Sequence, residues 1–282
     1  MNELAVRNNQ TEISKILNSE AGNKRLSDFF NGDTEKIQRF KTNLINIAGN
    51  YILTQCTPNS IIRSAFALAD IGLDINQTLK QAYILKYAND AEPVISYKGW
   101  QVLLRKGGKN TRAFCVYRCD KFSLNYNSFE GDLEFQPNYQ ERNETDREWF
   151  YKNLLGVVVK IKEVKGGLDE IFFVSAKKID KIKGCSPSVK RGKSSPYDEW
   201  FEEMYLAKAI KYVLSKQAFV FENDKLSEAI EMESNIEAKI QQNEQKMHEV
   251  KDFDELLSSD SGVRDMVKNL ETETEFEVEA IR

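Results

Sequence analysis

The sequence predicts an α+β fold, in which a small antiparallel β-sheet with hairpins packs on helices and a small helical region follows at the C-terminal end. Apolar residues recur at helical spacing in some blocks and alternate at strand spacing in others. These blocks lack the regular strand–helix alternation of a parallel sheet. The 282 residues, 41% of them hydrophobic, suffice for a sizeable core.

The first third of the chain predicts a flexible segment and then two helices. Residues 1–32 are polar, and we expect them to be loosely held. A stripe of apolar residues follows Asp33 and Thr34, either of which can cap a helix. Ser60 is expected to cap the next helix, and Gly72 is expected to end it.

Hairpins and short strands supply the predicted sheet, and helices lie between them. The hairpin across Gly166 has one apolar face and one partly basic face, which carries Lys160 and Lys162. Trp200 is expected in the buried face of the last long helix. The expected strands are 81–87, 92–97, 112–117, 121–126, 154–164 and 168–174; the expected helices are 99–106, 175–183 and 197–217; and the expected loops are 136–148 and 184–196.

Charge is unevenly distributed along the chain and indicates a domain organisation. Residues 98–221 carry 23 basic and 16 acidic side chains, a net charge of +7, whereas residues 222–282 carry 7 basic and 18 acidic ones, a net charge of −11. A basic middle and an acidic end favour a body that binds a polyanion. We expect a polyanion-binding core at 33–235, a linker at 236–251 and a small acidic region at 252–282.

Several classes of protein are disfavoured by the residues present. The uncharged stretch 42–62 is too polar to span a membrane, and no signal segment precedes it, so we expect a cytoplasmic protein with reduced cysteines. Gly192-Lys193-Ser194 resembles the end of a phosphate loop, but Pro187 stands where that loop needs glycine. The single histidine, His248, leaves little material for nucleophilic catalysis. We therefore expect no enzyme and no cofactor, with Mg²⁺ serving at most as a DNA counterion.

A metal-dependent DNA nuclease remains the enzymatic alternative. Glu163 and Lys165 form a Glu-x-Lys pattern at a strand end, and Asp120 or Asp132 could add a ligand. Hard cations need several converging oxygen ligands.

Basic residues gather in three clusters that favour nucleic-acid binding. Phosphates need cations at short repeated spacing, and aromatic rings can stack on bases. We expect the first two clusters to form the walls of one groove and the third to form its floor. The predicted contacts are Tyr97, Lys98, Arg105, Lys106, Lys109 and Arg112 in the first cluster, Lys177, Lys178, Lys181, Lys183, Lys190, Arg191 and Lys193 in the second, and Lys208 and Lys211 in the third.

Four motifs within residues 55–230 occur in an order and spacing that a known family shares. They are Ser60 to Leu73, Gln81 to Leu85, Val94 to Gly108 with its Tyr-Lys-Gly, and Ser195 to Met204 with its Glu-Glu-Met. Together they resemble the RecT family of phage single-strand annealing proteins. The family often has a more basic run at 206–211, where this chain keeps Lys208 and Lys211.

The resemblance implies a core fold of the annealing superfamily and an ATP-independent protein that binds single-stranded DNA and pairs complementary strands into duplex DNA during phage-type homologous recombination. It also implies a homo-oligomer, either a ring or a helical filament. With this resemblance, 33–235 is the expected DNA-binding, annealing and oligomerisation core, and 252–282 is the expected partner-binding region. The implied partners are a phage exonuclease and the single-strand-binding protein of the bacterial host. A membrane is not expected as a partner. A non-annealing module that binds single strands and an interaction scaffold are the remaining alternatives.

Overall fold

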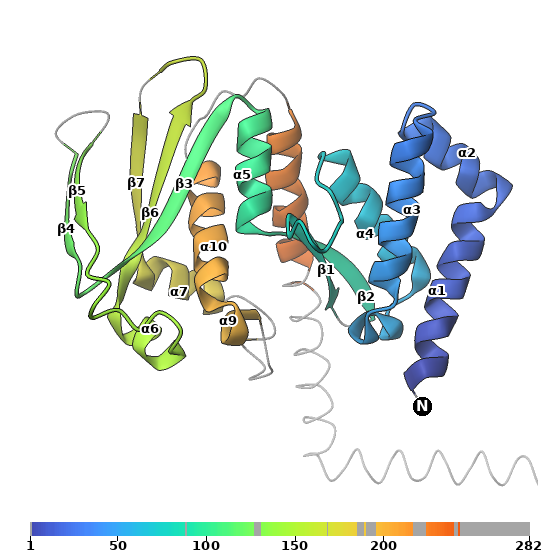
Figure 1. Ribbon diagram of the computed structural model, residues 1–282, viewed down its shortest axis with the longest axis horizontal. Coiled ribbons are helices and arrows are strands. Elements are labelled where there is room, and N and C mark those ends of the chain that lie inside the picture. The colour runs from blue at the N-terminus through green and yellow to red at the C-terminus, as the bar shows by residue number, and fades with distance from the viewer. Residues whose placement is uncertain are drawn as a thin grey trace, which may run out of the picture. The chain divides into compact units, whose positions relative to one another are not determined.

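Small antiparallel sheets and the helices around them confirm the predicted α+β class (Figure 1). In this computed structural model the described residues are 2–87, 89–126, 131–167, 169–184, 189, 196–216, 224–239 and 242. Their contacts divide the chain into two units, Met1–Ile236 and Glu237–Arg282. In the second unit only residues 237–239 and 242 are described, so the small helical region expected at the C-terminal end lies outside the described part.

The N-terminal residues form two packed helices, which corrects the expectation of a flexible segment at 1–32. Ser19 ends the first helix and caps the second by accepting a hydrogen bond from the Gly22 N–H at 3.1 Å. Ile13 and Leu26 are fully buried against the next helices. The elements of this part are α1 (Asn2–Asn18), α2 (Glu20–Phe29), α3 (Thr34–Ala48), the 3₁₀ helix η1 (Tyr51–Gln55) and α4 (Pro58–Asp70).

Helix α4 is tied to the first hairpin by two serine side chains. Its cap is Thr57, with Pro58 in the first turn, rather than the predicted Ser60. Ser60 Oγ instead accepts a hydrogen bond from the Ala91 N–H at 3.0 Å, and Ser64 Oγ donates one to the Ala91 carbonyl at 2.7 Å. The predicted first hairpin is confirmed and consists of β1 (Ala82–Tyr87) and β2 (Asp90–Ile95). The strands pair from Ala82↔Ile95 to Tyr87↔Asp90, so β2 begins two residues earlier than expected.

A three-stranded antiparallel sheet lies at the centre of the second half of the molecule. Its order is β3–β6–β7, with β3 at Lys109–Tyr117, β6 at Leu154–Glu163 and β7 at Asp169–Ser175. The predicted second hairpin, β6–β7, is therefore confirmed. A further hairpin of β4 (Lys121–Asn125) and β5 (Asp132–Gln136) lies beside it.

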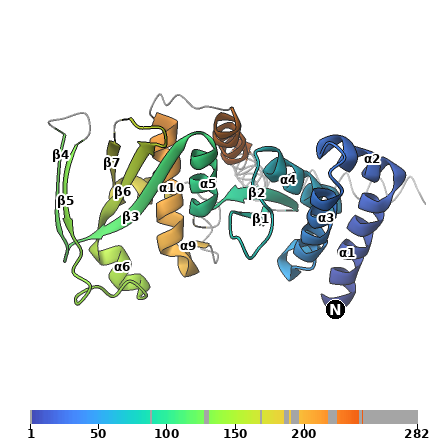
Figure 2. The same ribbon diagram turned by 45° about the horizontal axis from the view of Figure 1, so that its top comes forward.

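The two faces of this sheet are covered differently. Val157, Val159 and Ile161 of β6 face the main core, where α5 and α10 pack side by side against the sheet (Figures 1 and 2). Val158 faces a smaller cluster beneath the β4–β5 hairpin. The alternation along β6 thus gives one buried apolar face and a second face that is buried at Val158, half-buried at Lys160 and exposed at Lys162, which confirms the predicted partly basic face. The helices of this part are α5 (Tyr97–Lys106), α6 (Arg147–Asn153), α7 (Ala176–Gly184), α9 (Pro196–Glu199) and α10 (Phe201–Lys216).

The second half departs from the expected elements at three places. The loop expected over 136–148 is confirmed for 137–146, but Gln136 ends β5 and α6 begins at Arg147, with Asp146 as its cap. The helix expected over 197–217 is broken into α9 and α10 at Trp200, which is 47% exposed rather than buried. Residues 225–239 form a helix that the sequence pattern did not predict. None of the described helices is long and apolar enough to cross a membrane.

Candidate nucleic-acid interface

An open cleft of about 790 Å³ runs along the exposed face of α5 and across β3 to β6. Ser96 caps α5, and the buried face of that helix carries Trp100, Leu103 and Leu104. The opposite face therefore turns Lys98 and Arg105, two turns apart, toward the cleft. The lining residues are Leu79, Gln81, Lys98, Gln101, Val102, Arg105, Asn110, Thr111, Arg112, Lys160, Ile161, Lys162 and Asp169.

The cleft carries a surplus of positive charge. Among its lining residues are five cations and one carboxylate, Asp169, which pairs with Lys162 at 3.0 Å. Arg112 on β3 lies directly opposite Lys160 on β6 in the strand register. Like charges in that position destabilise an antiparallel pair. The arrangement therefore costs stability in the free protein and favours an anion that screens the two charges.

Hydrogen bonds hold the walls of the cleft in place. Arg105 Nε donates to Asn110 Oδ1 at 3.3 Å, which uses one of the five donors of the guanidinium group. Gln101 donates from α5 to the Thr111 carbonyl at 3.5 Å, and Thr111 Oγ1 donates to the Lys160 carbonyl at 2.9 Å. The cations are thus mounted on a helix and two strands that are bonded to one another.

The structure brings three residues of the first predicted cluster, Lys98, Arg105 and Arg112, into the cleft. Lys106 donates instead to the Gly72 carbonyl at 2.5 Å. Lys109 was predicted to contact DNA, and the structure corrects this. It is 5% exposed and pairs with Glu163 at 2.8 Å. That contact also lowers the pKa of Glu163.

Tyr97, predicted as a stacking ring, is partly buried against the core and does not line the cleft. Lys160 and Lys162 line it, although they are not among the contacts predicted from the sequence. The signal that could have found them is the basic face of the second hairpin, because strand pairing places this face opposite Arg112.

The second predicted cluster lies at the other end of the sheet. Ser175, which leads into α7, pairs with Gly156, whereas Asp169 of the cleft pairs with Lys162. Those two positions on β6 are about 20 Å apart at roughly 3.3 Å per residue. The expectation that the clusters form two walls of one groove is therefore wrong for the described part of α7. Lys190, Arg191 and Lys193 lie outside the described residues.

Within α7, exposed and covered lysines differ. Lys177, Lys178 and Lys181 are exposed. Lys183 is half-buried among three tyrosine rings, and burial lowers the pKa of its ammonium group. The distances from Lys183 Nζ to the ring centroids are 3.8 Å for Tyr151, 5.5 Å for Tyr197 and 6.0 Å for Tyr205. Lys183 thus joins α7 to α6, α9 and α10 through cation–π contacts, and this corrects its predicted role.

The predicted floor of the groove, Lys208 and Lys211 on α10, does not line the cleft. Lys208 is half-buried. Lys211 is 7% exposed and pairs with Glu233 of the 225–239 helix at 3.3 Å. Glu233 also accepts a hydrogen bond from the Ile95 N–H at 2.9 Å. Lys211 is therefore an internal ion-pair partner, which corrects the prediction that it contacts DNA.

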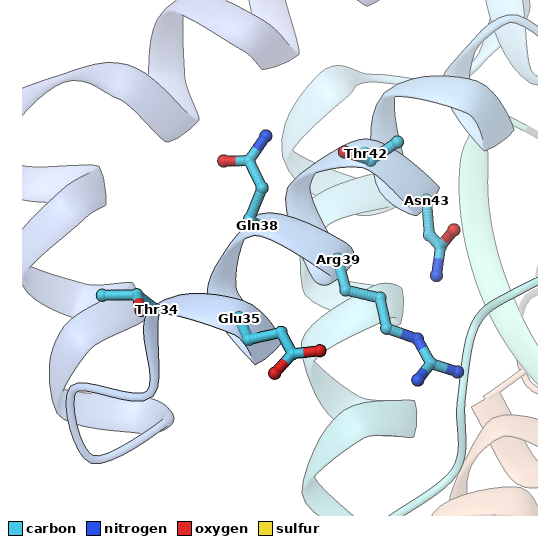
Figure 3. Close-up of a pocket in the computed structure, with 6 residues that line it drawn as sticks. All are labelled: Thr34, Glu35, Gln38, Arg39, Thr42 and Asn43. Atoms are coloured by element: carbon cyan, nitrogen blue, oxygen red, sulfur yellow. The ribbon is translucent and has the colours of Figure 1, made fainter.

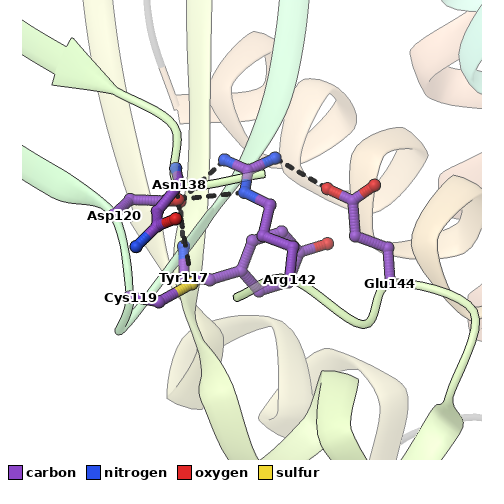
Figure 4. A network of polar contacts seen from close by, with 6 residues as sticks. All are labelled: Tyr117, Cys119, Asp120, Asn138, Arg142 and Glu144. Carbon is purple, nitrogen blue, oxygen red and sulfur yellow. Dashed lines mark hydrogen bonds and ion pairs between the residues drawn. The ribbon is translucent and has the colours of Figure 1, made fainter. Parts of the chain in front are cut away.

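Two of the carboxylates proposed for a nuclease, Asp120 and Glu163, are paired with cations, and the third, Asp132, is exposed at the start of β5. Asp120, whose side chain is fully buried, accepts hydrogen bonds from Arg142 at 2.9 and 2.7 Å and from two backbone N–H groups (Figure 4). Burial raises the pKa of Asp120, but these hydrogen bonds outweigh it and hold the pKa below its ordinary value. Glu163 pairs with Lys109, as described above. Across the described residues no group of three or more His, Cys, Asp or Glu side chains could hold a metal ion.

A second hollow, of about 480 Å³, lies on α3 and is lined by that helix alone (Figure 3). Its arginine, Arg39, pairs with Asp74 at 2.5 Å, and Asn43 contacts the same carboxylate. The charge of Arg39 is therefore already neutralised. This hollow offers neither a second wall nor a surplus of positive charge.

One family model matches most of the chain. The family model described as RecT family matches residues 38–248, and all five cations of the cleft lie within this range. The chain belongs to the RecT family. Membership of the RecT family implies annealing of single-stranded DNA in recombination. A comparison with curated proteins found no match.

Proposed function

We propose that this RecT-family protein anneals complementary single strands without ATP, and that it holds their phosphates in the cleft between α5 and strands β3 and β6. The observation that carries the proposal is the set of five cations in one cleft, with Arg112 opposite Lys160. Contacts to phosphate carry no sequence information, so binding is nearly independent of sequence. No covalent step is required, because pairing needs only that the repulsion between two polyanions is screened.

The protein acts as a homo-oligomer, a ring or a helical filament, in which successive clefts follow one strand. The acidic region at 252–282 docks a partner, for which a phage exonuclease and the host single-strand-binding protein are the proposed candidates. Mg²⁺ enters only as a counterion of DNA. Electron microscopy with and without single strands tests the assembly, and a complex with one subunit per strand would contradict it.

The annealing of two fluorescently labelled complementary strands, followed without nucleotide, tests the proposed activity. We compare the wild-type protein with Arg105→Glu/Arg112→Glu. The matched control is Lys15→Glu/Lys24→Glu, which reverses two exposed lysines on α1 and α2, outside the family match. The cleft variant should bind and anneal about tenfold less well or worse, because two cations no longer neutralise phosphates. The control should behave as wild type.

Other outcomes would favour other functions. Tight binding without faster pairing indicates a non-annealing binding module. Shortening of strands that requires Mg²⁺ indicates a nuclease, and absence of binding at moderate salt indicates a scaffold. Equal losses in the cleft variant and the control would show that net charge, rather than the cleft, governs binding.

A further inference from the structure

Trp200 differs from the other two tryptophans in its surroundings. Trp100 is 1% exposed in the core, and Trp149 is partly buried and packs on Tyr117. Trp200, at the break between α9 and α10, is 47% exposed. A half-exposed indole presents a large apolar area at the surface, where it can contact a planar ligand.

Trp200 is linked to one end of the cleft through Lys80. The Lys80 Nζ lies 5.1 Å from the centroid of the Trp200 ring. Lys80 stands between Leu79 and Gln81, which both line the cleft. Its carbonyl accepts a hydrogen bond from Ser96, the cap of α5, at 2.6 Å. The exposed ring therefore lies where the cleft reaches the beginning of α5.

The charges near Trp200 differ from those farther along the cleft. Tyr83 of β1 is 41% exposed, and its pKa is raised by partial burial and by the nearby carboxylate of Glu203. Glu203 lies one turn beyond Trp200 on α10. One ammonium group and one carboxylate leave this end of the cleft without a surplus of positive charge. The ring therefore suits the face of a base, and the Lys80 ammonium group is the one cation here that suits its phosphate.

We propose that Trp200 is a stacking platform for one nucleobase of the single strand that occupies the cleft. An incoming nucleotide offers two partners at once: its base covers the indole, and its phosphate receives the Lys80 ammonium group that now lies over the ring. Stacking occupies the face of a base and leaves its pairing edge open, so it is compatible with annealing. This inference rests on the proposed function of the cleft.

The test compares two strands of equal length, oligo-dT and an abasic strand with the same phosphates. Trp200→Ala should bind oligo-dT about five- to a hundredfold more weakly than wild type and should bind the abasic strand equally well. Trp200→Phe should keep most of the affinity. Tyr51→Ala, which removes an aromatic residue that is 52% exposed on η1, is the matched control and should not change either affinity.

Tryptophan fluorescence gives a readout that a merely structural role would not move. Oligo-dT should quench the wild-type emission, and Trp200→Phe should lose most of that quenching, because Trp100 and Trp149 are covered. If oligo-dT still quenches the emission of Trp200→Phe, Trp200 is not a platform. The same conclusion follows if Trp200→Ala lowers the affinity for both strands equally. If wild type binds neither strand, the cleft proposal itself fails; if wild type binds the abasic strand while Trp200→Ala matches wild type on oligo-dT, only the platform fails.

Discussion

The cleft beside α5 and the region of α7 and α10 are both rich in basic residues, but the fold uses their charges differently. In the cleft, Lys98, Arg105 and Arg112 line open space. In the other region, Lys183 lies among tyrosine rings and Lys211 is buried with Glu233. A basic cluster in the sequence therefore shows only how many positive charges lie close together along the chain. The fold decides which of these charges pair with other residues and which can bind an external anion.

The largest expected effect concerns the buried ion pair. Glu233→Ala should lower the free energy of unfolding by about 3–5 kcal/mol, because it leaves the Lys211 ammonium group buried without that carboxylate. Lys211→Met/Glu233→Leu should restore most of the loss. Urea denaturation measures both. If the single variant is as stable as wild type, Lys211 is not the internal residue that the comparison requires.

Arg142 is a third cation with a largely buried side chain, and its pairing with Asp120 makes the stability of the protein depend on pH. Asp120→Asn should cost about 3 kcal/mol at pH 7, because it removes the charge of the main partner of Arg142. The folded-state pKa of Asp120 is lowered from 3.8, so the stability it contributes is complete above about pH 4 and is lost as the pH falls through the folded-state pKa. The difference in the free energy of unfolding between wild type and variant should therefore become smaller below pH 4, as acid denaturation would show. A difference that stays constant would contradict the lowered pKa of Asp120.

The salt dependence of DNA binding distinguishes the exposed cations of the cleft from those of α7. Arg105→Ala/Arg112→Ala should make the slope of log affinity against log salt shallower by about 1.4, or about 0.7 for each single-strand phosphate that is no longer neutralised. Lys177→Ala/Lys181→Ala, which removes two exposed charges from α7, should change it less. Titrations at several salt concentrations measure both slopes, and a larger change in the α7 variant would reverse the assignment of the two regions.

The smallest effect is expected at Lys183. Lys183→Met keeps much of the side-chain volume and removes the ammonium group, so unfolding should become easier by about 1 kcal/mol because the cation–π interactions are removed. Affinity for single strands should stay within twofold of wild type. A clear loss of affinity without loss of stability would place Lys183 among the residues that contact DNA.

Much of the fold could be predicted from local patterns. The β6–β7 hairpin and α3, with its cap at Asp33, follow from strand alternation and helix periodicity. The N-terminal helices were missed because their polar surface hid a few deeply buried residues such as Ile13 and Leu26. The helix at 225–239 was missed for a similar reason: its buried face includes a carboxylate, Glu233, whose partner lies on another helix.

The cleft could be predicted only in part. Lys98 and Arg105 are recognisable because they share a helix face with the spacing of two turns. Lys109 and Arg112 look equivalent in the sequence, but strand pairing buries the first beside Glu163 and opens the second toward Lys160. Trp200 was assigned to the core because a continuous helix would have buried it, whereas the break between α9 and α10 exposes it. Such distinctions depend on contacts between distant segments.

Gly99 allows the first turn of α5 to lie directly against Gln81 and Ile95. A Cβ atom at this position would lie 2.1 Å from the Gln81 carbonyl oxygen and 2.8 Å from a methyl group of Ile95. Even an alanine would therefore push the first turn of α5 away from the strand that precedes it, and would move Lys98 and Arg105 without altering either side chain. The position of these two positive charges on the cleft thus depends on the absence of a single methyl group.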